Sequence, residues 1–209
     1  VVDDITMGVT HVIRGEDHIP NTPRQLLIYE ALGVTPPLFG HMPLMLGKDR
    51  AKLSKRHGAL ATMAYRDQGF LPQSLVNYLA RLGWSHGDQE IFTLDEMTRL
   101  FDIHDVNKSA SALNVDKMLW TNQQHMLRST PEHLARYLAP QLKALGLPVD
   151  DMEKVAAVAK AQQERAKTLK EMAANSVFFF RDVLEYEAKA AAKNLTREAA
   201  PTLQAARDK

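Results

Sequence analysis

The feature that most limits the possible folds is a well-marked helix flanked by two short apolar segments. The segment Asn21–Gly33 begins with polar residues that can cap a helix, has Pro23 in its first turn and ends at a glycine. The β-branched segment Gly8–Gly15 precedes it, the apolar segment Leu38–Leu46 follows it, and each has the length of a strand. This order predicts a βαβ unit of a parallel sheet. The preceding VVDDITMG suits a further strand with a turn near Asp4–Thr6.

The rest of the chain predicts helices rather than strands. Leucine and tyrosine side chains recur at helical spacing in LPQSLVNYLARLG, which ends at Gly83. Thr93 and Glu96 have the spacing of a capping box at a helix start, and NVDKMLWTNQQHM again has helical spacing. From residue 127 onward the segments are long, amphipathic and rich in alanine, among them DMEKVAAVAKAQQERAKTLKEM. They predict a helical bundle with a joint at Gly146–Pro148.

These patterns divide the chain into an α/β part and a mostly α part, in three regions. Residues 1–58 hold the βαβ unit and a basic loop, residues 59–126 form a mostly helical region, and residues 127–209 begin the bundle. We therefore expect a βαβ unit of a parallel sheet followed by two helical regions.

The composition excludes several classes of protein. Hydrophobic residues make up 45% of the 209 residues, so the chain can build cores and is not expected to be disordered. The net charge is only +1, so any contact with nucleic acid must come from a local patch. The absence of cysteine excludes disulfides and zinc-thiolate sites and fits the cytoplasm. No apolar run reaches the ~20 residues of a membrane span, and no signal peptide is recognisable.

A basic segment, AKLSKRHGA, follows the second strand of the predicted unit. Lys52, Lys55 and Arg56 supply cationic donors suited to phosphate oxygens, Ser54 adds a hydroxyl, and Gly58 allows close backbone approach. Ligands of open α/β sheets bind beyond the carboxyl ends of the strands. A run of charges is commonly a solvated surface, but this position makes a phosphate-binding loop the sharper interpretation.

The order of residues in this segment resembles a known signature. KLSKR resembles the Lys-Met-Ser-Lys-Ser signature of class I aminoacyl-tRNA synthetases, and LGKDRAKLSKRHGA is similar to the version in bacterial glutamyl-tRNA synthetases. THVIRGEDHIPNTPRQLLIYEALG, YRDQGFLPQSLVNYLARLGWSHGDQEIFT and FDIHDVNKSASALNVDKMLWTNQQHM resemble the same family in the same order. The resemblance is dense from Val1 to about Met126 and weaker beyond. It implies the second half of a Rossmann-type catalytic domain, a stem-contact region and the start of a helical anticodon-binding domain.

The resemblance implies a two-step reaction. Glutamate and ATP give glutamyl-adenylate and pyrophosphate, and the glutamyl group then passes to the terminal ribose of tRNA(Glu). Lys55 would stabilise charge on the phosphates, with Lys52 as the second catalytic lysine and Ser54 in the ATP site. Arg56, like Lys55, would contact phosphate or tRNA. A magnesium ion normally accompanies the nucleotide, although no dedicated metal-binding cluster is recognisable.

The segment IRGEDH gives the second candidate site. By the same resemblance, Arg14 would bind the side-chain carboxylate of glutamate, because an arginine at a strand end can clamp a carboxylate with two hydrogen bonds. Asp17, and with it Glu16, would lie near ATP. In HMPLM, Met45 would lie against the adenine and His41 near the site. Local ion pairs and ordinary core packing are the structural alternatives for these residues.

The chain also departs from the family pattern. The His-Ile-Gly-His signature of the first catalytic half occurs nowhere in it, and it starts at Val1 rather than methionine. We therefore expect a piece of a longer enzyme, inactive by itself, whose parent is a monomer. The alternatives are a shorter relative that glutamylates a modified tRNA base, which the bundle disfavours, a glutaminyl-tRNA synthetase, and a truncated paralogue that only binds tRNA or a protein.

Overall fold

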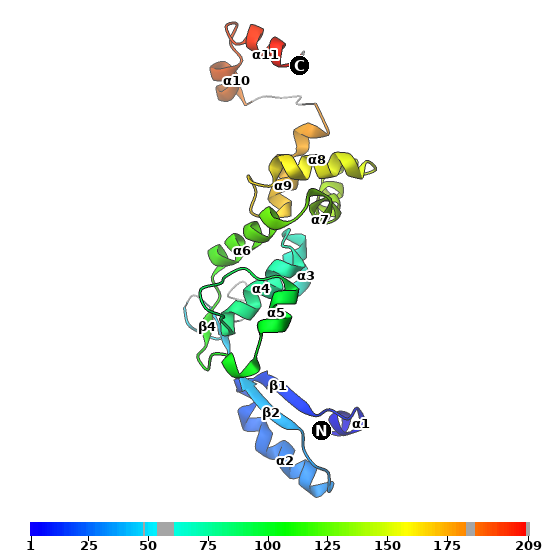
Figure 1. Cartoon of the computed structure of the whole chain (residues 1–209), viewed down its shortest axis with the longest axis vertical. Coiled ribbons are helices and arrows are strands. Elements are labelled where there is room, and N and C mark those ends of the chain that lie inside the picture. Colours follow the sequence, from blue (N-terminus) through cyan, green and yellow to red (C-terminus); the bar gives the residue numbers. More distant parts are fainter. Residues whose placement is uncertain (48, 54–60, 183–186, 208–209) are drawn as a thin grey trace.

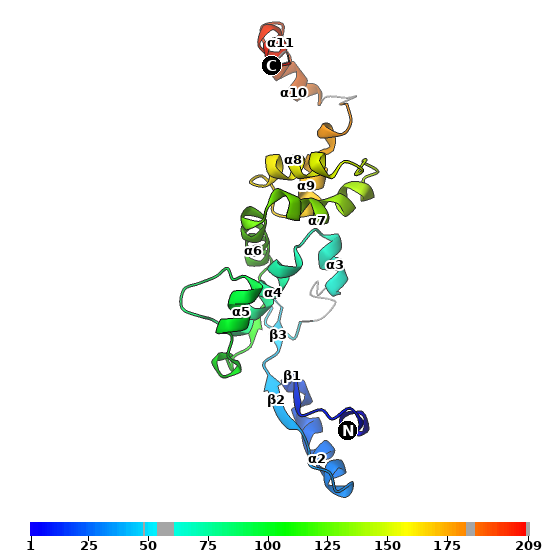
Figure 2. The same ribbon diagram turned by 45° about the vertical axis from the view of Figure 1, so that its right-hand side comes forward.

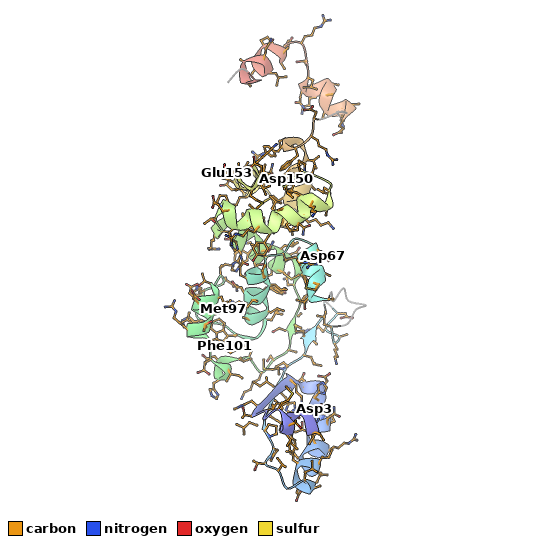
Figure 3. The ribbon with its side chains drawn as sticks, turned by 90° about the vertical axis from the view of Figure 1, so that its right-hand side faces the viewer. Asp3, Asp67, Met97, Phe101, Asp150 and Glu153 are labelled. Carbon is orange, nitrogen blue, oxygen red and sulfur yellow. The ribbon has the colours of Figure 1, made fainter. Side chains whose placement is uncertain are left out.

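The computed structural model describes residues 1–47, 49–53, 61–182 and 187–207. The elements follow one another along an elongated molecule, with a small sheet at the N-terminal end and α10 and α11 at the other end (Figure 1). Figure 3 shows the same separation, with Asp3 labelled in the sheet region and Asp150 and Glu153 in the helical bundle. None of the helices in these ranges is long and apolar enough to cross a membrane.

The predicted βαβ unit is present. Strand β1 (His11–Gly15) pairs in parallel with β2 (Leu38–Met42), and α2 (Thr22–Ala31) connects them after a 3-10 turn, η1 (Glu16–Asn21). The register places Arg14 opposite His41, near the carboxyl ends of both strands. The sheet therefore brings the IRGEDH segment beside the segment that leads to the basic loop.

The expectation of a strand in VVDDITMG was wrong, because α1 (Val2–Thr6) is a short helix. Asp3 and Asp4 lie in its first turn, where negative charge is favourable beside the exposed backbone N–H groups. The Tyr29 hydroxyl donates a hydrogen bond to Asp4 Oδ2 at 3.0 Å. Residues far apart in the sequence thus tie α1 to α2.

The segment Leu38–Leu46 is two strands rather than the one expected strand. It divides at Pro43, which has no N–H to donate to a sheet, and β3 (Met45–Leu46) begins beyond it. Strand β3 pairs in parallel with β4 (Ser111–Ala112), which lies far along the chain. The chain therefore leaves one small sheet and enters another before it reaches the basic loop.

The middle of the chain forms short helices that start and stop largely where the sequence signals predict. These are α3 (Thr62–Asp67), α4 (Pro72–Gly83), α5 (Leu94–Leu100), η3 (Ile103–Asp105) and α6 (Val115–Arg128). Thr93 and Glu96 form the predicted capping box at the start of α5. The Asn114 side chain caps α6 by accepting from the N–H of Lys117 at 3.0 Å.

The bundle consists of α7 (Pro131–Ala144), α8 (Met152–Gln162) and α9 (Leu169–Asn175), followed by η4 (Val177–Phe179). The sequence pattern predicts one long amphipathic segment over residues 151–172, whereas the structure has two separate helices there, α8 and α9. The side-chain amide of Gln163, just after α8, donates to the Met126 and Ser129 carbonyls at 2.6 and 2.9 Å. Thr168 then caps α9 by accepting from the Glu171 N–H at 3.1 Å. Tertiary hydrogen bonds and a local cap together end one helix and start the next.

The two terminal helices, α10 (Ala188–Asn194) and α11 (Ala200–Arg207), have no fully buried residue among those described. Figures 1 and 2 both show them beyond the bundle. Leu195 and Leu203 are about half exposed, at 49% and 51%. The core of this part of the chain is thus supplied by α7 to α9.

The core of the bundle extends into the middle region. Leu71, before α4, and Met126, near the end of α6, are buried with residues of α7, α8 and α9. Asn122 of α6 accepts hydrogen bonds from the Leu71 N–H and the Ser74 hydroxyl and donates to the Lys167 carbonyl. The expected boundary after residue 126 thus falls within α6, where packing is continuous.

Candidate active site at the carboxyl end of the parallel sheet

Arg14 lies near the carboxyl end of β1 and is held by the first turn of α2. One terminal nitrogen of its guanidinium donates to Thr22 Oγ1 and to Gln25 Oε1, both at 2.8 Å. The guanidinium carbon is 5.2 Å from the centre of the Phe39 ring, which suits a cation–π contact. The side chain of Arg14 is therefore fixed in orientation by three neighbours.

These contacts do not use every donor of the Arg14 guanidinium. Its Nε is buried and makes no hydrogen bond to the described residues. No carboxylate among residues 1–47, 49–53, 61–182 and 187–207 forms an ion pair with it. A half-buried, oriented cation without an acidic partner is suited to receive a carboxylate ligand.

His41 of β2 joins this group through Thr22. Its Nε2 lies 3.1 Å from Thr22 Oγ1. The sequence predicted a position for His41 near the site, whereas it missed Gln25 and treated Thr22 only as a possible helix cap. The available signal was spacing, because residues three apart lie on one face of a helix.

Asp17 in η1 forms an ion pair with Lys52, the first lysine of the basic segment. The distance between Lys52 Nζ and Asp17 Oδ2 is 2.6 Å. The hydrogen bond from Lys52 lowers the pKa of Asp17 below its ordinary value, and the charge on Lys52 acts in the same direction. A Cβ atom at Gly15 would collide with Asp17 Oδ1, so the absence of a side chain there makes room for the carboxylate.

The backbone around Met45 fixes the near end of the basic loop. The Leu53 N–H donates to the Met45 carbonyl at 2.9 Å, and the Gly47 N–H donates to the Ala51 carbonyl at 2.8 Å. Glu16 Oε1 accepts from the Leu44 N–H at 3.3 Å. The acidic residues of η1 therefore hold both the connection from β2 to β3 and, through Lys52, the start of the loop.

The predicted site residues are only partly covered by the structure. Arg14, Asp17, Met45 and Lys52 are described, and they all belong to β1, η1, β3 and the loop start. Ser54, Lys55 and Arg56 lie outside the described residues. Within the described ranges, no group of three or more histidine and acidic side chains is placed to hold a metal ion.

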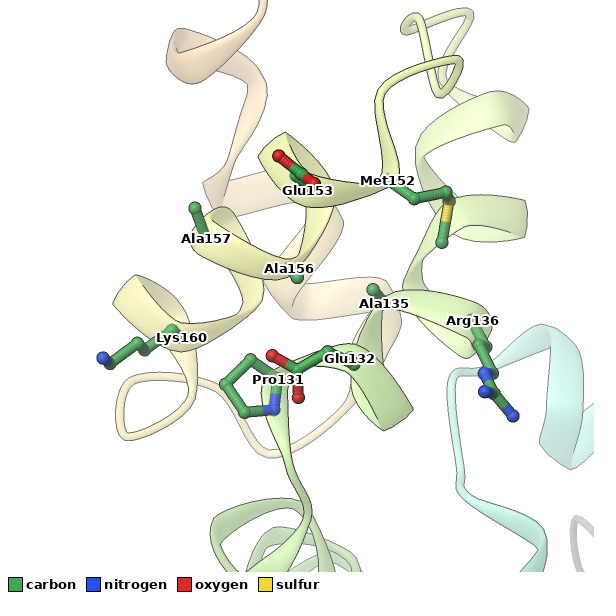
Figure 4. A pocket seen from close by; sticks show the side chains of 9 residues that line it. All are labelled: Pro131, Glu132, Ala135, Arg136, Met152, Glu153, Ala156, Ala157 and Lys160. Atoms are coloured by element: carbon green, nitrogen blue, oxygen red, sulfur yellow. The ribbon is translucent and has the colours of Figure 1, made fainter.

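A larger open cavity lies elsewhere in the molecule. It has a volume of about 860 Å³ and lies between α7 and α8, where Pro131, Ala135 and Ala156 form part of its lining (Figure 4). Glu132, Glu153, Arg136 and Lys160 mix both signs of charge around it. This open groove has no arrangement of groups suited to catalysis, so the candidate site remains the end of the parallel sheet.

Comparison with known proteins assigns a domain family to each of two parts of the chain. Residues 1–120 match the catalytic domain of class I tRNA synthetases (E and Q), and residues 132–209 match an anticodon binding domain. The chain is 59% identical over 208 residues to glutamate–tRNA ligase 1 of Alkalilimnicola ehrlichii. It is 58% identical over 195 residues to that of Nitrosococcus oceani and 50% identical over 209 residues to glutamate–tRNA ligase of Geobacter sulfurreducens.

The same comparisons show how much of these relatives the chain represents. It matches 100%, 93% and 100% of its own length against those three proteins but covers only 44%, 42% and 45% of theirs. A solved glutamate tRNA ligase from Elizabethkingia meningosepticum, in complex with its amino acid, superposes with a TM-score of 0.76 at 32% identity, covering 97% of this chain and 44% of that one. By its catalytic-domain match and its fold, the chain belongs to the class I tRNA synthetases of the glutamate and glutamine group.

Proposed function

We propose that this chain supplies one side of the active site of a longer glutamate–tRNA ligase. In the first step, a carboxylate oxygen of L-glutamate attacks the α-phosphate of ATP, giving glutamyl-adenylate and pyrophosphate. In the second, a ribose hydroxyl at the end of tRNA(Glu) displaces AMP from the adenylate and takes the glutamyl group. The names of the relatives and the two matched domains support this assignment.

The observation that carries the proposal is the oriented guanidinium of Arg14, which has no acidic partner in the described part of the chain. The guanidinium is held by Thr22 and Gln25, and its buried Nε is left without a partner. A carboxylate that accepts from this guanidinium would form a charge-assisted pair. We assign this role to the side-chain carboxylate of substrate glutamate. Arg14 would then select an amino acid that has a side-chain carboxylate in addition to the reacting α-carboxylate.

The ion pair between Asp17 and Lys52 supports a role in placing the basic loop. Because Lys52 is the first cation of the segment, its contact with η1 determines where the following residues start. We assign Lys55 to stabilising charge on the phosphates of ATP, Ser54 to the same nucleotide site and Arg56 to phosphate or tRNA contact. Met45 would lie against the adenine, with Asp17 also facing the nucleotide.

The remaining parts of the proposal concern the parent enzyme. A magnesium ion would accompany ATP and neutralise charge on its phosphates. We propose residues 1–58 as the second half of the catalytic domain, 59–126 as the stem-contact region and 127–209 as the start of the anticodon-binding domain. The parent would act as a monomer in the cytoplasm.

The role of Arg14 can be tested in the longer parent enzyme by ATP–pyrophosphate exchange. Replacing Arg14 with alanine should raise the KM for glutamate about 100-fold, because the ligand carboxylate loses its charged partner. The KM for ATP should stay within about threefold. Arg99→Ala, which removes an exposed arginine of α5, is the matched control and should leave both values unchanged. Equal rises in both constants would show that Arg14 is only structural.

The role of Lys55 needs a different comparison. Lys55→Ala should lower the rate of adenylate formation far more than it weakens glutamate binding, because its charge acts on the phosphates as the reaction proceeds. Single-turnover measurement of adenylate formation separates the two effects. Equal losses in rate and affinity would argue against a transition-state role.

A further inference from the structure

The groups that hold the Arg14 guanidinium are uncharged. Its Nη2 donates one hydrogen bond to Thr22 Oγ1 and one to Gln25 Oε1, and the Phe39 ring lies 5.2 Å from the guanidinium carbon. Both protons of Nη2 are thereby used. The other terminal nitrogen, Nη1, makes no hydrogen bond to the described residues and, unlike Nε, is not enclosed. A ligand can therefore reach Arg14 while Thr22 and Gln25 keep hold of it.

The acidic side chains of this region are engaged with other groups. Asp17 pairs with Lys52 at 2.6 Å. Asp4 accepts from the Tyr29 hydroxyl at 3.0 Å, and this hydrogen bond is the main cause that lowers the pKa of Asp4, whereas the charge of Arg14 contributes least. In the part of the chain that the structure describes, Arg14 is thus oriented by neutral groups and paired with no carboxylate.

Gln25 is the group of this set whose charge matters most. It is half-buried in the first turn of α2, the helix that runs along the β1–β2 sheet (Figures 1 and 2). Glutamine and glutamate have nearly the same shape, so a glutamate at this position could make the same 2.8 Å contact with Arg14. That contact would be a permanent ion pair, which is stronger than a hydrogen bond to a neutral amide. A neutral acceptor here fixes the orientation of Arg14 and leaves its charge uncompensated.

We propose that Gln25 is a positioning residue that sets the selectivity of Arg14 for an acidic ligand. Its amide oxygen orients the guanidinium without neutralising it, so the counter-charge comes from the ligand. This inference rests on the proposed function, in which the ligand is the side-chain carboxylate of substrate glutamate. An acidic residue in place of Gln25 would pair with Arg14 and repel that carboxylate. The selectivity thus depends on a residue of α2 as well as on the arginine itself.

Gln25→Glu in the longer parent enzyme tests this role, because it changes the charge of the side chain and keeps its shape. ATP–pyrophosphate exchange with tRNA(Glu) present gives kcat and the KM values for glutamate and ATP. We expect the KM for glutamate to rise about 50-fold, because two carboxylates then compete for one guanidinium. The KM for ATP and kcat should stay within about threefold. The preference for glutamate over glutamine in kcat/KM should fall at least about tenfold, because neutral glutamine loses no ion pair.

Two further variants separate the loss of a contact from the gain of a charge. Gln25→Met keeps the length of the side chain but removes the acceptor, so the KM for glutamate should rise about fivefold. In an Arg14→Ala background the same substitution should add less than about twofold, because Gln25 acts through Arg14. Arg24→Gln lowers the net charge by as much as Gln25→Glu does, at an exposed neighbouring position of α2, and should leave both KM values unchanged.

The outcomes distinguish this inference from the proposed function on which it rests. A raised KM for glutamate in Arg14→Ala but not in Gln25→Glu would overturn the role of Gln25 and leave that of Arg14 intact. An unchanged KM for glutamate in both variants would overturn both roles. Equal rises in the KM values for glutamate and ATP, together with a lower unfolding temperature, would show that Gln25 only supports the fold.

Discussion

The sheet region and the helical region of this chain differ in how much of their own apolar surface they cover. In residues 1–53, Tyr29 is the one large apolar side chain in the described core, while Ile13, Leu27 and Leu38 are 52%, 65% and 68% exposed. In residues 61–180, one described core cluster runs from Leu71 through α9, and two smaller clusters lie around Tyr78 and Trp84. The helical region thus builds its own core, whereas the sheet region leaves apolar side chains exposed that a complete domain would cover.

This difference agrees with the lengths of the relatives. The chain covers less than half of the glutamate–tRNA ligases that it matches. Two parallel strands and one covering helix make a marginal structure, because such sheets are normally covered on both faces. We expect further residues of the parent to cover the apolar side chains of β1, α2 and β2, and thereby to complete the site around Arg14.

Hydrogen exchange should reveal the largest difference between the two regions. Amides of α4, α6 and α7 should exchange about a thousandfold more slowly than those of β1 and β2, because only the helical region requires cooperative unfolding for exchange. Mass spectrometry of peptides or residue-resolved spectra would measure this. Equal protection in both regions would show that the sheet region shares the stability of the helical core.

Gly69→Ala should give the next largest effect, within the helical region. Gly69 has a φ of 84°, and a Cβ there would collide with the backbone nitrogens of Leu169 and Lys170. We expect a loss of about 3 kcal/mol in the free energy of unfolding, from backbone strain and from displacement of α9. Urea unfolding followed by helical circular dichroism measures this loss.

Two other glycines provide matched controls for Gly69. Gly87 and Gly33 also have positive φ, at 53° and 65°, but a Cβ on either would meet nothing within 4 Å. Gly87→Ala should cost about 1 kcal/mol from strain alone. Gly33 lies after α2 in the sheet region. Gly33→Ala should therefore leave the unfolding of the helical region unchanged. A large effect of Gly33→Ala on that transition would contradict the independence of the two regions.

His125 makes the stability of the helical region depend on pH. The residue is buried, and its Nε2 donates to Asn77 Oδ1 at 2.9 Å, since Asn77 Nδ2 donates to the Glu90 carbonyl. Burial, and to a smaller extent the charge of Arg128, lowers the pKa of His125 from 6.5 to about 4. The unfolded state therefore binds more protons between these values, and stability falls as pH falls through this range.

The expected loss between pH 6.5 and pH 4 is about 3 kcal/mol from this histidine. Urea unfolding at a series of pH values would measure it. Because carboxylates also titrate near the lower limit, His125→Gln is the reference, and the difference between the two pH profiles isolates the histidine. Parallel profiles for the natural chain and the variant would refute a neutral, buried imidazole.

The smallest effect is expected at the start of α5. Thr93→Ala removes the capping box with Glu96 and should cost about 1 kcal/mol. Thr98→Ala, on the same helix, removes only a hydrogen bond to the Leu94 carbonyl and should change stability by less than about 0.5 kcal/mol. Equal effects of the two substitutions would mean that the cap contributes nothing beyond helix propensity.

Elements with local signals could be predicted from the sequence. The start of α2 at Thr22, the capping box at Thr93 and the turn at Gly146 depend on residues next to them in the chain. The helix α1 could not be recognised from its β-branched residues, because its place is fixed by Tyr29. The break after Gln162 depends likewise on the distant acceptors Met126 and Ser129, although Thr168 and Glu171 have visible capping spacing.

The candidate site shows the same limit. The resemblance indicated Arg14, Asp17, Met45 and Lys52, but the partner of each depends on tertiary structure. The contacts of Arg14 with Gln25 and of Asp17 with Lys52 join residues 11 and 35 positions apart. Their roles in binding glutamate and ATP stay predictions, as do those of Ser54, Lys55 and Arg56.

ATP–pyrophosphate exchange with glutamate tests the central claim most directly, when it is measured on the 209-residue chain and on its longer parent under identical conditions. The claim is that the chain contributes Arg14 and the basic loop to a site whose other side belongs to the rest of the parent. We predict exchange by the parent and none above background by the chain alone. Glutamate-dependent exchange by the isolated chain, or its absence from the parent, would contradict the claim.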